Sequence, residues 1–257
     1  FGCQMNEHDS ERISGMFELD GMSKAISEEY ADVLFVNTCT IRENADDKLY
    51  GTLGQLKQWK SQKDNRKLLV GGCAAQKDKE LVREKAPWVD VVIGTHNLTN
   101  VVDLLNRSED WGPITEIIDE IETLPTEAPS IRESEYSAWL TIQIGCNNSC
   151  TFCIVPSVRG QEISRRPSDI VNEAKKLVDE GVKEITLLGQ NVNSYGRDLK
   201  IEGKARPYFS QLLEQLNDIK GLERIRFTSP HPKDFKAETI ESVKKLKNVC
   251  NQVHVPL

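Results

Sequence analysis

The chain has 257 residues, of which 38% are hydrophobic and 28% are charged, the balance of an ordinary folded protein. Its apolar runs fall short of the roughly 20 residues that a membrane-spanning helix requires, so we expect no membrane anchor. The formal net charge of −7 argues against capture of nucleic acid by overall charge, although a local basic patch is compatible with it. Seven cysteines form an odd, sparse set without a secretory segment, which indicates a reducing, cytoplasmic compartment and not a disulfide framework.

The first region alternates short apolar runs with amphipathic stretches. Runs rich in β-branched residues and bounded by polar residues or glycine predict strands at 32–37, 67–71 and 90–94. Helix formers with charged faces predict helices at 43–60 and 77–86. Because strands and helices alternate, we expect an open α/β domain over residues 1–107, with a parallel sheet covered by helices on both faces.

The next stretch, residues 108–137, breaks this alternation. Nine acidic residues fall between Glu109 and Glu135 against the single basic residue Arg132, and three prolines are interspersed. This composition is typical of a linker, and we expect an acidic connector between two domains.

A second alternation follows over residues 138–257. Strands are predicted at 138–144, 183–188, 224–228 and 252–257, with helices at 168–180, 207–217 and 236–247. The pattern predicts a partial (β/α) barrel. The chain starts at Phe1 and stops within the last of these apolar runs, so we expect a fragment that is truncated at both ends.

Three cysteines, Cys146, Cys150 and Cys153, lie within eight residues directly after the first strand of this barrel. Parallel α/β folds place reactive groups at the carboxyl ends of their strands. Thiolates this close together can hold three corners of an iron-sulfur cluster and leave one iron open. A structural zinc site usually has four ligands and no second Cys or His pair lies nearby, so zinc is the weaker alternative, as are three unrelated core thiols.

Three earlier cysteines, Cys3, Cys39 and Cys73, each stand where a strand is expected to end. The carboxyl ends of parallel strands lie along one edge of a sheet, so these thiols could converge on a second cluster. Taken alone the signal is weak, because a single Cys after a strand is more often a small core residue. Cys250 fits neither set and is predicted to be structural.

The spacing of the later triplet, with the aromatic Phe152 just before its last cysteine, resembles the radical S-adenosylmethionine superfamily. The resemblance implies that Cys146, Cys150 and Cys153 bind a [4Fe-4S] cluster whose open iron binds S-adenosylmethionine. It also implies reductive cleavage of that cofactor to a 5′-deoxyadenosyl radical, for which the protein supplies positioning and shielding.

Six segments, in order along nearly the whole chain, resemble the methylthiotransferase family. Within that family Gln4-Met5-Asn6 is similar to the branch that acts on tRNA. The ribosomal-protein branch typically shows Pro-Lys-Asn at this place, and the threonylcarbamoyladenosine branch shows Lys-Val-Asn. The segments are residues 2–10, 37–42, 72–74, 159–165, 189–196 and 229–232.

This narrower resemblance implies addition of a methylthio group to C2 of N6-isopentenyladenosine at position 37 of tRNA, in the anticodon stem-loop. It implies a second [4Fe-4S] cluster at Cys3, Cys39 and Cys73 that holds or supplies the sulfur. It also implies S-adenosylmethionine, an external reductant of the flavodoxin or ferredoxin type and a sulfur donor as partners, and we expect a monomer. The family's barrel has six strands and a following RNA-binding β-domain, so we expect impaired activity in the fragment as given.

Several polar residues are weaker candidates. Gln190, Asn191 and Ser229 follow predicted strands and are candidates for contacts to S-adenosylmethionine, although they fit loop caps equally well. Arg159, Arg165 and Arg166 could reach the cofactor carboxylate or an RNA phosphate. Basic residues between Lys57 and Lys67 are better explained as a solvated helix face than as an RNA footprint.

Two rival functions stay open from the sequence. The first is a methylthiotransferase that acts on threonylcarbamoyladenosine in tRNA or on a ribosomal protein, which shares all six cluster cysteines. The second is a non-enzymatic, RNA-associated module in which the cysteines hold zinc.

Overall fold

The computed structural model describes residues 2–40, 43–120, 129–201, 204–205 and 207–253. These residues form two compact units, and each is described by itself. The first unit contains the described residues up to 120, residues 129–131 and the segment 149–160. The second contains residues 132–148 and the described residues from 161 onward. No helix in the described ranges is both long and apolar enough to cross a membrane.

The first unit is built on a sheet of four parallel strands in the order β1-β2-β3-β4. Three of the strands match the predicted positions, and the carboxyl ends of β1 and β2 are in register, with Thr38 opposite Gly72. The fourth was not predicted, because its three residues lie in the acidic stretch. The strands are β1 Val33–Thr38, β2 Lys67–Gly72, β3 Val91–Ile93 and β4 Ile114–Glu116.

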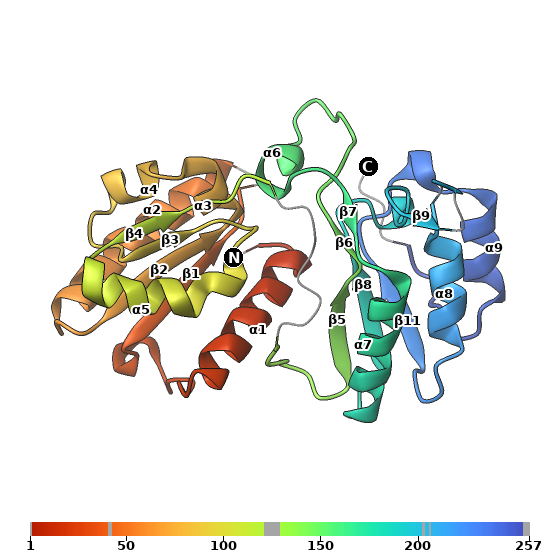
Figure 1. Cartoon of the computed structure of the whole chain (residues 1–257), viewed down its shortest axis with the longest axis horizontal. Helices are drawn as coiled ribbons and strands as arrows, with labels where there is room; N and C mark the ends of the chain where they lie inside the picture. The colour runs from red at the N-terminus through yellow and green to blue at the C-terminus, as the bar shows by residue number, and fades with distance from the viewer. Residues whose placement is uncertain (1, 41–42, 121–128, 202–203, 206, 254–257) are drawn as a thin grey trace. The chain divides into compact units, whose positions relative to one another are not determined.

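Helices cover both faces of this sheet, as predicted from the alternation (Figure 1). Helices α2, α3 and α4 pack against Leu68, Val70 and Val92, while α1 and α5 pack against Leu69 and Val91. The two cores therefore follow the alternation of side chains along each strand. The helices are α1 Gln4–Leu19, α2 Glu43–Ser61, α3 Cys73–Asp78, α4 Leu81–Lys85 and α5 Val101–Trp111, with 3₁₀ turns at Glu28–Tyr30 and Leu98–Asn100.

Some elements of this unit differ from the prediction. Cys3 precedes α1 directly, with an extended backbone, and does not follow a strand within the described residues. The predicted helix 77–86 is divided, because Lys79 has a φ of 51° and breaks the helical path. The predicted domain limit at residue 107 falls inside α5, and β4 beyond it pairs with β3. Residues 121–128 of the predicted connector lie outside the described residues.

The second unit contains a parallel sheet of three strands in the order β11-β8-β5. Its helices α7, α8 and α9 contribute to one core together with Leu140, Leu187 and Phe227, which agrees with the predicted partial barrel. The elements are β5 Ser137–Thr141, α7 Pro167–Asp179, β8 Glu184–Leu188, α8 Phe209–Asn217, β11 Arg224–Phe227 and α9 Ala237–Lys245.

Shorter elements complete this unit. The antiparallel pair β6 Gln143–Ile144 and β7 Ile163–Ser164 follows β5, and a second pair joins β9 Lys200–Ile201 to β10 Lys204–Ala205. The 3₁₀ turns are Val192–Ser194 and Pro232–Asp234. A parallel bridge joins Val249 to Ile225, and residues 254–257 of the predicted last strand lie outside the described residues.

The segment 149–160 contains the short helix α6 Val155–Arg159 and packs within the first unit. The hydroxyl of Thr95 donates a hydrogen bond of 2.6 Å to the carbonyl oxygen of Val158. The predicted boundary at residue 138 therefore differs from the compact units, because this segment returns to the N-terminal sheet.

Candidate functional site

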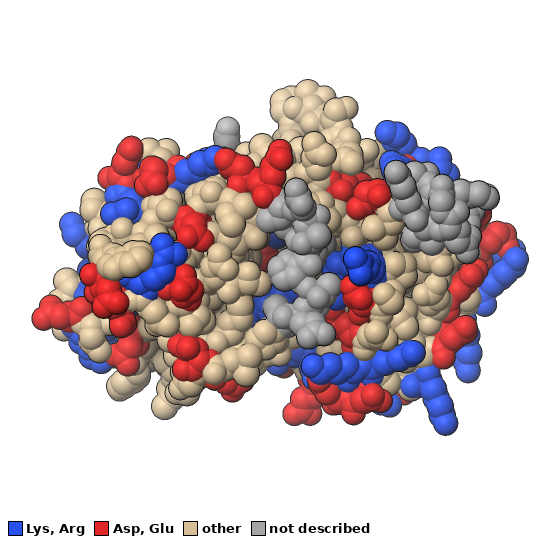
Figure 2. Space-filling view, viewed as in Figure 1, with Lys and Arg blue, Asp and Glu red and all other residues tan. Residues whose placement is uncertain are grey.

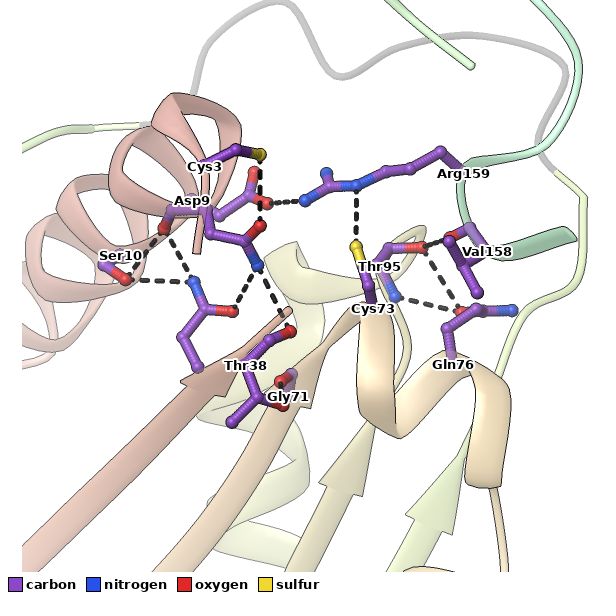
Figure 3. A network of polar contacts seen from close by, with 12 residues as sticks. Cys3, Asp9, Ser10, Thr38, Gly71, Cys73, Gln76, Thr95, Val158 and Arg159 are labelled. Atoms are coloured by element: carbon purple, nitrogen blue, oxygen red, sulfur yellow. Dashed lines mark hydrogen bonds and ion pairs between the residues drawn. The ribbon is translucent and has the colours of Figure 1, made fainter. Parts of the chain in front are cut away.

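A buried arginine links α6 to the carboxyl edge of the N-terminal sheet. Arg159 is the last residue of α6 and is 3% exposed. One of its terminal nitrogens, Nη2, forms an ion pair of 2.7 Å with Oδ2 of Asp9 on α1. Its Nε donates a hydrogen bond of 3.3 Å to Sγ of Cys73. In Figure 3 the thiols of Cys3 and Cys73 both point toward this guanidinium.

Burial and the Arg159 cation act in opposite directions on the Cys73 thiol: burial raises its pKa, the cation lowers it, and the net shift is upward. Burial works to lower the pKa of Arg159, but the charge and hydrogen bond of Asp9, together with the neighbouring thiols, outweigh it, so the net shift is upward and the guanidinium stays charged. Negative charge on Cys3 also raises the pKa of Arg159, and negative charge on Cys39 raises the pKa of Cys73.

The strand ends explain why two of these cysteines are neighbours. Thr38 and Gly72 are paired in register, and each is followed directly by a cysteine, Cys39 or Cys73. Gly72 turns the chain from β2 into α3 with a φ of 92°. A Cβ at this position would come within 2.6 Å of the carbonyl oxygen of Thr38, so only glycine fits the turn.

A pair of asparagines holds the start of α1 against the end of β1. The Asn6 amide donates to Oδ1 of Asn37 at 3.1 Å, and the Asn37 amide donates to the carbonyl oxygen of Asn6 at 2.7 Å. Both residues are buried. The thiol of Cys3 lies 3.4 Å from Oδ1 of Asn6, so the same contacts position Cys3 at this edge.

The later triplet is divided between the two units. Cys146 is buried after β6 in the second unit, and its Sγ accepts a hydrogen bond of 3.5 Å from the backbone nitrogen of Asn148. Cys150 and Cys153 are exposed and belong to the first unit. The backbone nitrogen of Cys153 donates to the carbonyl oxygen of Cys150 at 3.1 Å, and the Phe152 side chain between them is fully exposed.

The candidates for cofactor contacts in the second unit differ in their surroundings. Gln190 and Asn191 follow β8, and the Asn191 amide donates to Oδ2 of the buried Asp234 at 2.7 Å. Ser229 is exposed near the end of β11 and has a φ of 56°. Arg165 is buried, donates to the carbonyl oxygen of Thr141 at 2.9 Å and forms an ion pair with a carboxylate on α7.

Comparisons with known proteins match both units. Residues 1–94 match the family described as uncharacterized protein family UPF0004, and residues 140–257 match the radical SAM superfamily. The tRNA-2-methylthio-N(6)-dimethylallyladenosine synthase of Corynebacterium efficiens is 52% identical over 261 residues, which cover 100% of this chain and 50% of that protein. The chain belongs to the radical S-adenosylmethionine methylthiotransferase family.

Other relatives agree with this membership. Proteins of the same printed name from Nocardia farcinica and Mycobacteroides abscessus are each 51% identical to the whole chain, which covers 52% and 51% of their lengths. The chain thus spans about half the length of the curated relatives it matches.

Solved structures support the fold. The radical S-adenosylmethionine methyltransferase TsrM from Kitasatospora setae has a TM-score of 0.59 at 12% identity, covering 95% of this chain and 50% of that one. The cobalamin-dependent radical enzyme OxsB has a TM-score of 0.58 at 12% identity, covering 97% of this chain and 41% of that one.

Membership of the superfamily implies a [4Fe-4S] cluster and S-adenosylmethionine. The N-terminal cysteines fit a soft metal centre chemically, because Cys3, Cys39 and Cys73 are free thiols, and the first and last of them interact with a buried cation. Within the described ranges no three His, Cys, Asp or Glu side chains lie close enough to hold a single metal ion. A cubane cluster binds each thiolate on a different iron, so ligation by either cysteine triplet stays a prediction.

Two acidic residues were missed as candidates. Asp9 is buried on α1 and pairs with Arg159. Glu162 is 6% exposed in the second unit, where burial raises the pKa of its carboxyl group, although a hydrogen bond from Ser194 opposes the shift. The one available signal was that both lie inside segments that carry the family resemblance, residues 2–10 and 159–165.

The basic residues between 57 and 67 are engaged within the first unit. Arg66 is 2% exposed, and its Nη1 donates to the carbonyl oxygen of Trp59 at 2.6 Å. Lys60 forms an ion pair of 2.5 Å with Asp90. On the face shown in Figure 2, Lys and Arg side chains alternate with Asp and Glu. These contacts favour a structural role over an RNA footprint.

Proposed function

We propose that the full-length protein containing this chain is a tRNA-modifying methylthiotransferase that adds a methylthio group to C2 of N6-isopentenyladenosine. The observation that carries the proposal is identity of about half the residues, across the whole chain, to synthases named for this product. Both cysteine sets required by the chemistry are present.

The proposed cofactors are two [4Fe-4S] clusters and S-adenosylmethionine. Cys146, Cys150 and Cys153 are the proposed ligands of one cluster, and Cys3, Cys39 and Cys73 those of the other. When bound, the clusters and S-adenosylmethionine supply a carbon-centred radical and a methylated sulfur. The roles left to the chain are to hold the ligand sulfurs, to orient the adenine and to exclude water.

Further partners follow from this chemistry. An anticodon stem-loop is the proposed substrate, a flavodoxin or ferredoxin the proposed electron source, and a sulfur donor the source of the inserted atom. Gln190, Asn191, Ser229 and Phe152 are proposed to contact the cofactor, since they lie at strand ends of the second unit or beside a proposed cluster ligand. The proposed state and location are a monomer in the cytoplasm.

The modified nucleoside formed in a reaction shows which substrate the protein accepts. The full-length protein, reconstituted anaerobically and supplied with S-adenosylmethionine, dithionite and sodium sulfide as the sulfur source, is expected to convert isopentenylated tRNA to its 2-methylthio form, measured by nucleoside mass spectrometry. Reaction only with threonylcarbamoylated tRNA or with a ribosomal protein contradicts the proposed substrate. Zinc without acid-labile sulfide in the reconstituted protein contradicts the radical chemistry, for which about eight irons per chain are expected.

Two single cysteine variants, one at a proposed cluster ligand and one outside both cysteine sets, provide a matched comparison. Cys146→Ala is expected to abolish methylthiolation because it removes a proposed cluster ligand. Cys250→Ala removes a thiol that lies outside both sets and is expected to retain the iron content and the activity. Equal loss in both variants would indicate a general effect of cysteine removal on folding.

A further inference from the structure

Binding of a cluster iron by Cys73 does not by itself explain why the buried Arg159 donates a hydrogen bond to the Cys73 thiol. We propose that Arg159 is a positioning residue that holds Cys73 in place as a ligand and raises the reduction potential of the cluster bound by the N-terminal cysteines. The inference rests on the proposed function, because it requires a cluster at these cysteines.

Burying the charged guanidinium of Arg159 costs desolvation free energy, so its buried position requires compensating contacts. Removing a guanidinium from water carries a large free-energy cost unless its donors are paired. Asp9 compensates the charge at 2.7 Å, and Cys73 accepts the hydrogen bond from Nε at 3.3 Å. A simple ion pair needs only the carboxylate, whereas here the fork of the guanidinium is divided between oxygen and sulfur.

The elements around Arg159 hold it in this position from several sides. α6 is fixed by the 2.6 Å hydrogen bond from Thr95 to the carbonyl oxygen of Val158. Gly160, with a φ of 73°, ends the helix directly after Arg159. Asp9 projects from α1, the helix that also carries Cys3 at its start. Arg159, at the end of α6, is therefore held by Asp9 on α1 and by the hydrogen bond through which Thr95 fixes α6.

The charge balance predicts the direction of the effect. Each bound thiolate adds negative charge to the centre, and a one-electron reduction adds more. A fixed cation in contact with one of the sulfurs stabilises the reduced form more than the oxidised form, because charge and hydrogen bonds to sulfur set cluster potentials. In the test the electron comes from dithionite, and it stays on the cluster, so no further reactant is required.

The test uses the full-length protein with Cys146, Cys150 and Cys153 replaced by alanine, so that only the N-terminal cluster is present. In this background Arg159→Gln is expected to shift the midpoint potential to more negative values in a titration monitored by electron paramagnetic resonance. Iron release to a chelator is expected to be about tenfold faster, the effect of losing one charge-assisted hydrogen bond. Arg159→Lys keeps the charge and is expected to recover part of the potential.

Two further variants separate this role from folding. Arg66→Gln removes another buried arginine of the same unit, which bonds to the carbonyl oxygen of Trp59 and to Gln62, and is expected to leave the potential unchanged. If Arg159→Gln does not fold, Asp9→Asn combined with Arg159→Gln removes both buried charges together and avoids an unpaired carboxylate.

The outcomes distinguish the two proposals. Absence of iron and sulfide from the parent background overturns the second cluster and with it the proposed function. A cluster whose potential is the same in the parent and in the variant that lacks Arg159 overturns the positioning role alone. A shift of equal size in Arg66→Gln overturns it too, because the effect would then belong to any buried arginine.

Discussion

A single glycine determines where the Cys73 thiol lies. Gly72 is the last residue of β2, and its φ of 92° lets α3 begin at the next residue. A Cβ here would meet backbone atoms of Thr38 at 2.6 and 3.0 Å, and neither atom belongs to a flexible side chain. Strand β1 therefore passes close to the turn, and Cys39 and Cys73 leave the sheet side by side.

Gly72→Ala is expected to lower the free energy of unfolding by at least about 2 kcal/mol, since the left-handed backbone conformation and the clash with Thr38 both oppose the added methyl group. Urea denaturation followed by circular dichroism measures the change. Gly112→Ala is the matched control, because Gly112 also has a positive φ, of 80°, but no atom lies within 4 Å of the added Cβ. Its expected cost is about 1 kcal/mol, and equal costs at both positions contradict the role of the close approach.

At the scale of elements, α6 shows how a short segment is recruited by a distant sheet. Five residues make a helix too short to be stable alone, so its position depends on tertiary contacts. The Thr95 hydroxyl and the Arg159 guanidinium provide them, reaching the Val158 carbonyl oxygen and Asp9. This docking brings Cys150 and Cys153 into the first unit although they follow a strand of the second.

Thr95→Val is expected to loosen α6, because the substitution keeps the shape of the side chain but leaves the Val158 carbonyl oxygen without this donor, at a cost of about 1–3 kcal/mol. Trypsin cleavage after Arg159 reports on the opening and is expected to become several-fold faster. Thr115→Val is the control, since the buried Thr115 hydroxyl has no hydrogen-bond partner among the described residues. Unchanged cleavage in Thr95→Val would show that the ion pair alone holds the helix.

At the scale of the whole molecule, the two units hold their buried charge differently. In the first unit Asp9 is paired with a buried arginine. In the second unit Asp234 accepts from Asn191 at 2.7 Å and pairs with the half-exposed Arg197 at 2.6 Å. Burial works to raise the pKa of Asp234, but the hydrogen bonds from Asn191 and Arg197, together with nearby positive charge, outweigh it, and the pKa lies below its ordinary value of 3.8.

The lowered pKa of Asp234 predicts acid destabilisation of the second unit. Above pH 3.8 the ionised carboxylate contributes stability, and that contribution is lost as the pH falls through the lower, folded-state pKa, because the unfolded chain binds the proton more tightly. Asp234→Asn is expected to lower the urea midpoint at pH 7, and the difference from the parent is expected to shrink below pH 3.8. A difference that stays constant from pH 7 to pH 3 contradicts the linkage.

Most of the fold followed from local sequence patterns, and most departures from prediction have long-range causes. The parallel strands of both units were predicted because a short apolar run bounded by glycine or polar residues indicates a buried strand from the local sequence alone. Strand β4 was missed because three residues in an acidic stretch carry no such pattern, and only pairing with β3 makes them a strand. The break between α3 and α4 depends on one positive φ at Lys79, and it was not predicted because lysine rarely adopts a positive φ.

The sequence by itself determined the family, because motifs are local properties of the chain, and it predicted the two sets of cysteines. Only the tertiary structure decided that α6 packs within the first unit and that Arg159 contacts both Asp9 and Cys73, residues 150 and 86 positions away. The physical reason is that a buried charge takes its partners from whichever elements packing brings together, at distances that no local pattern records.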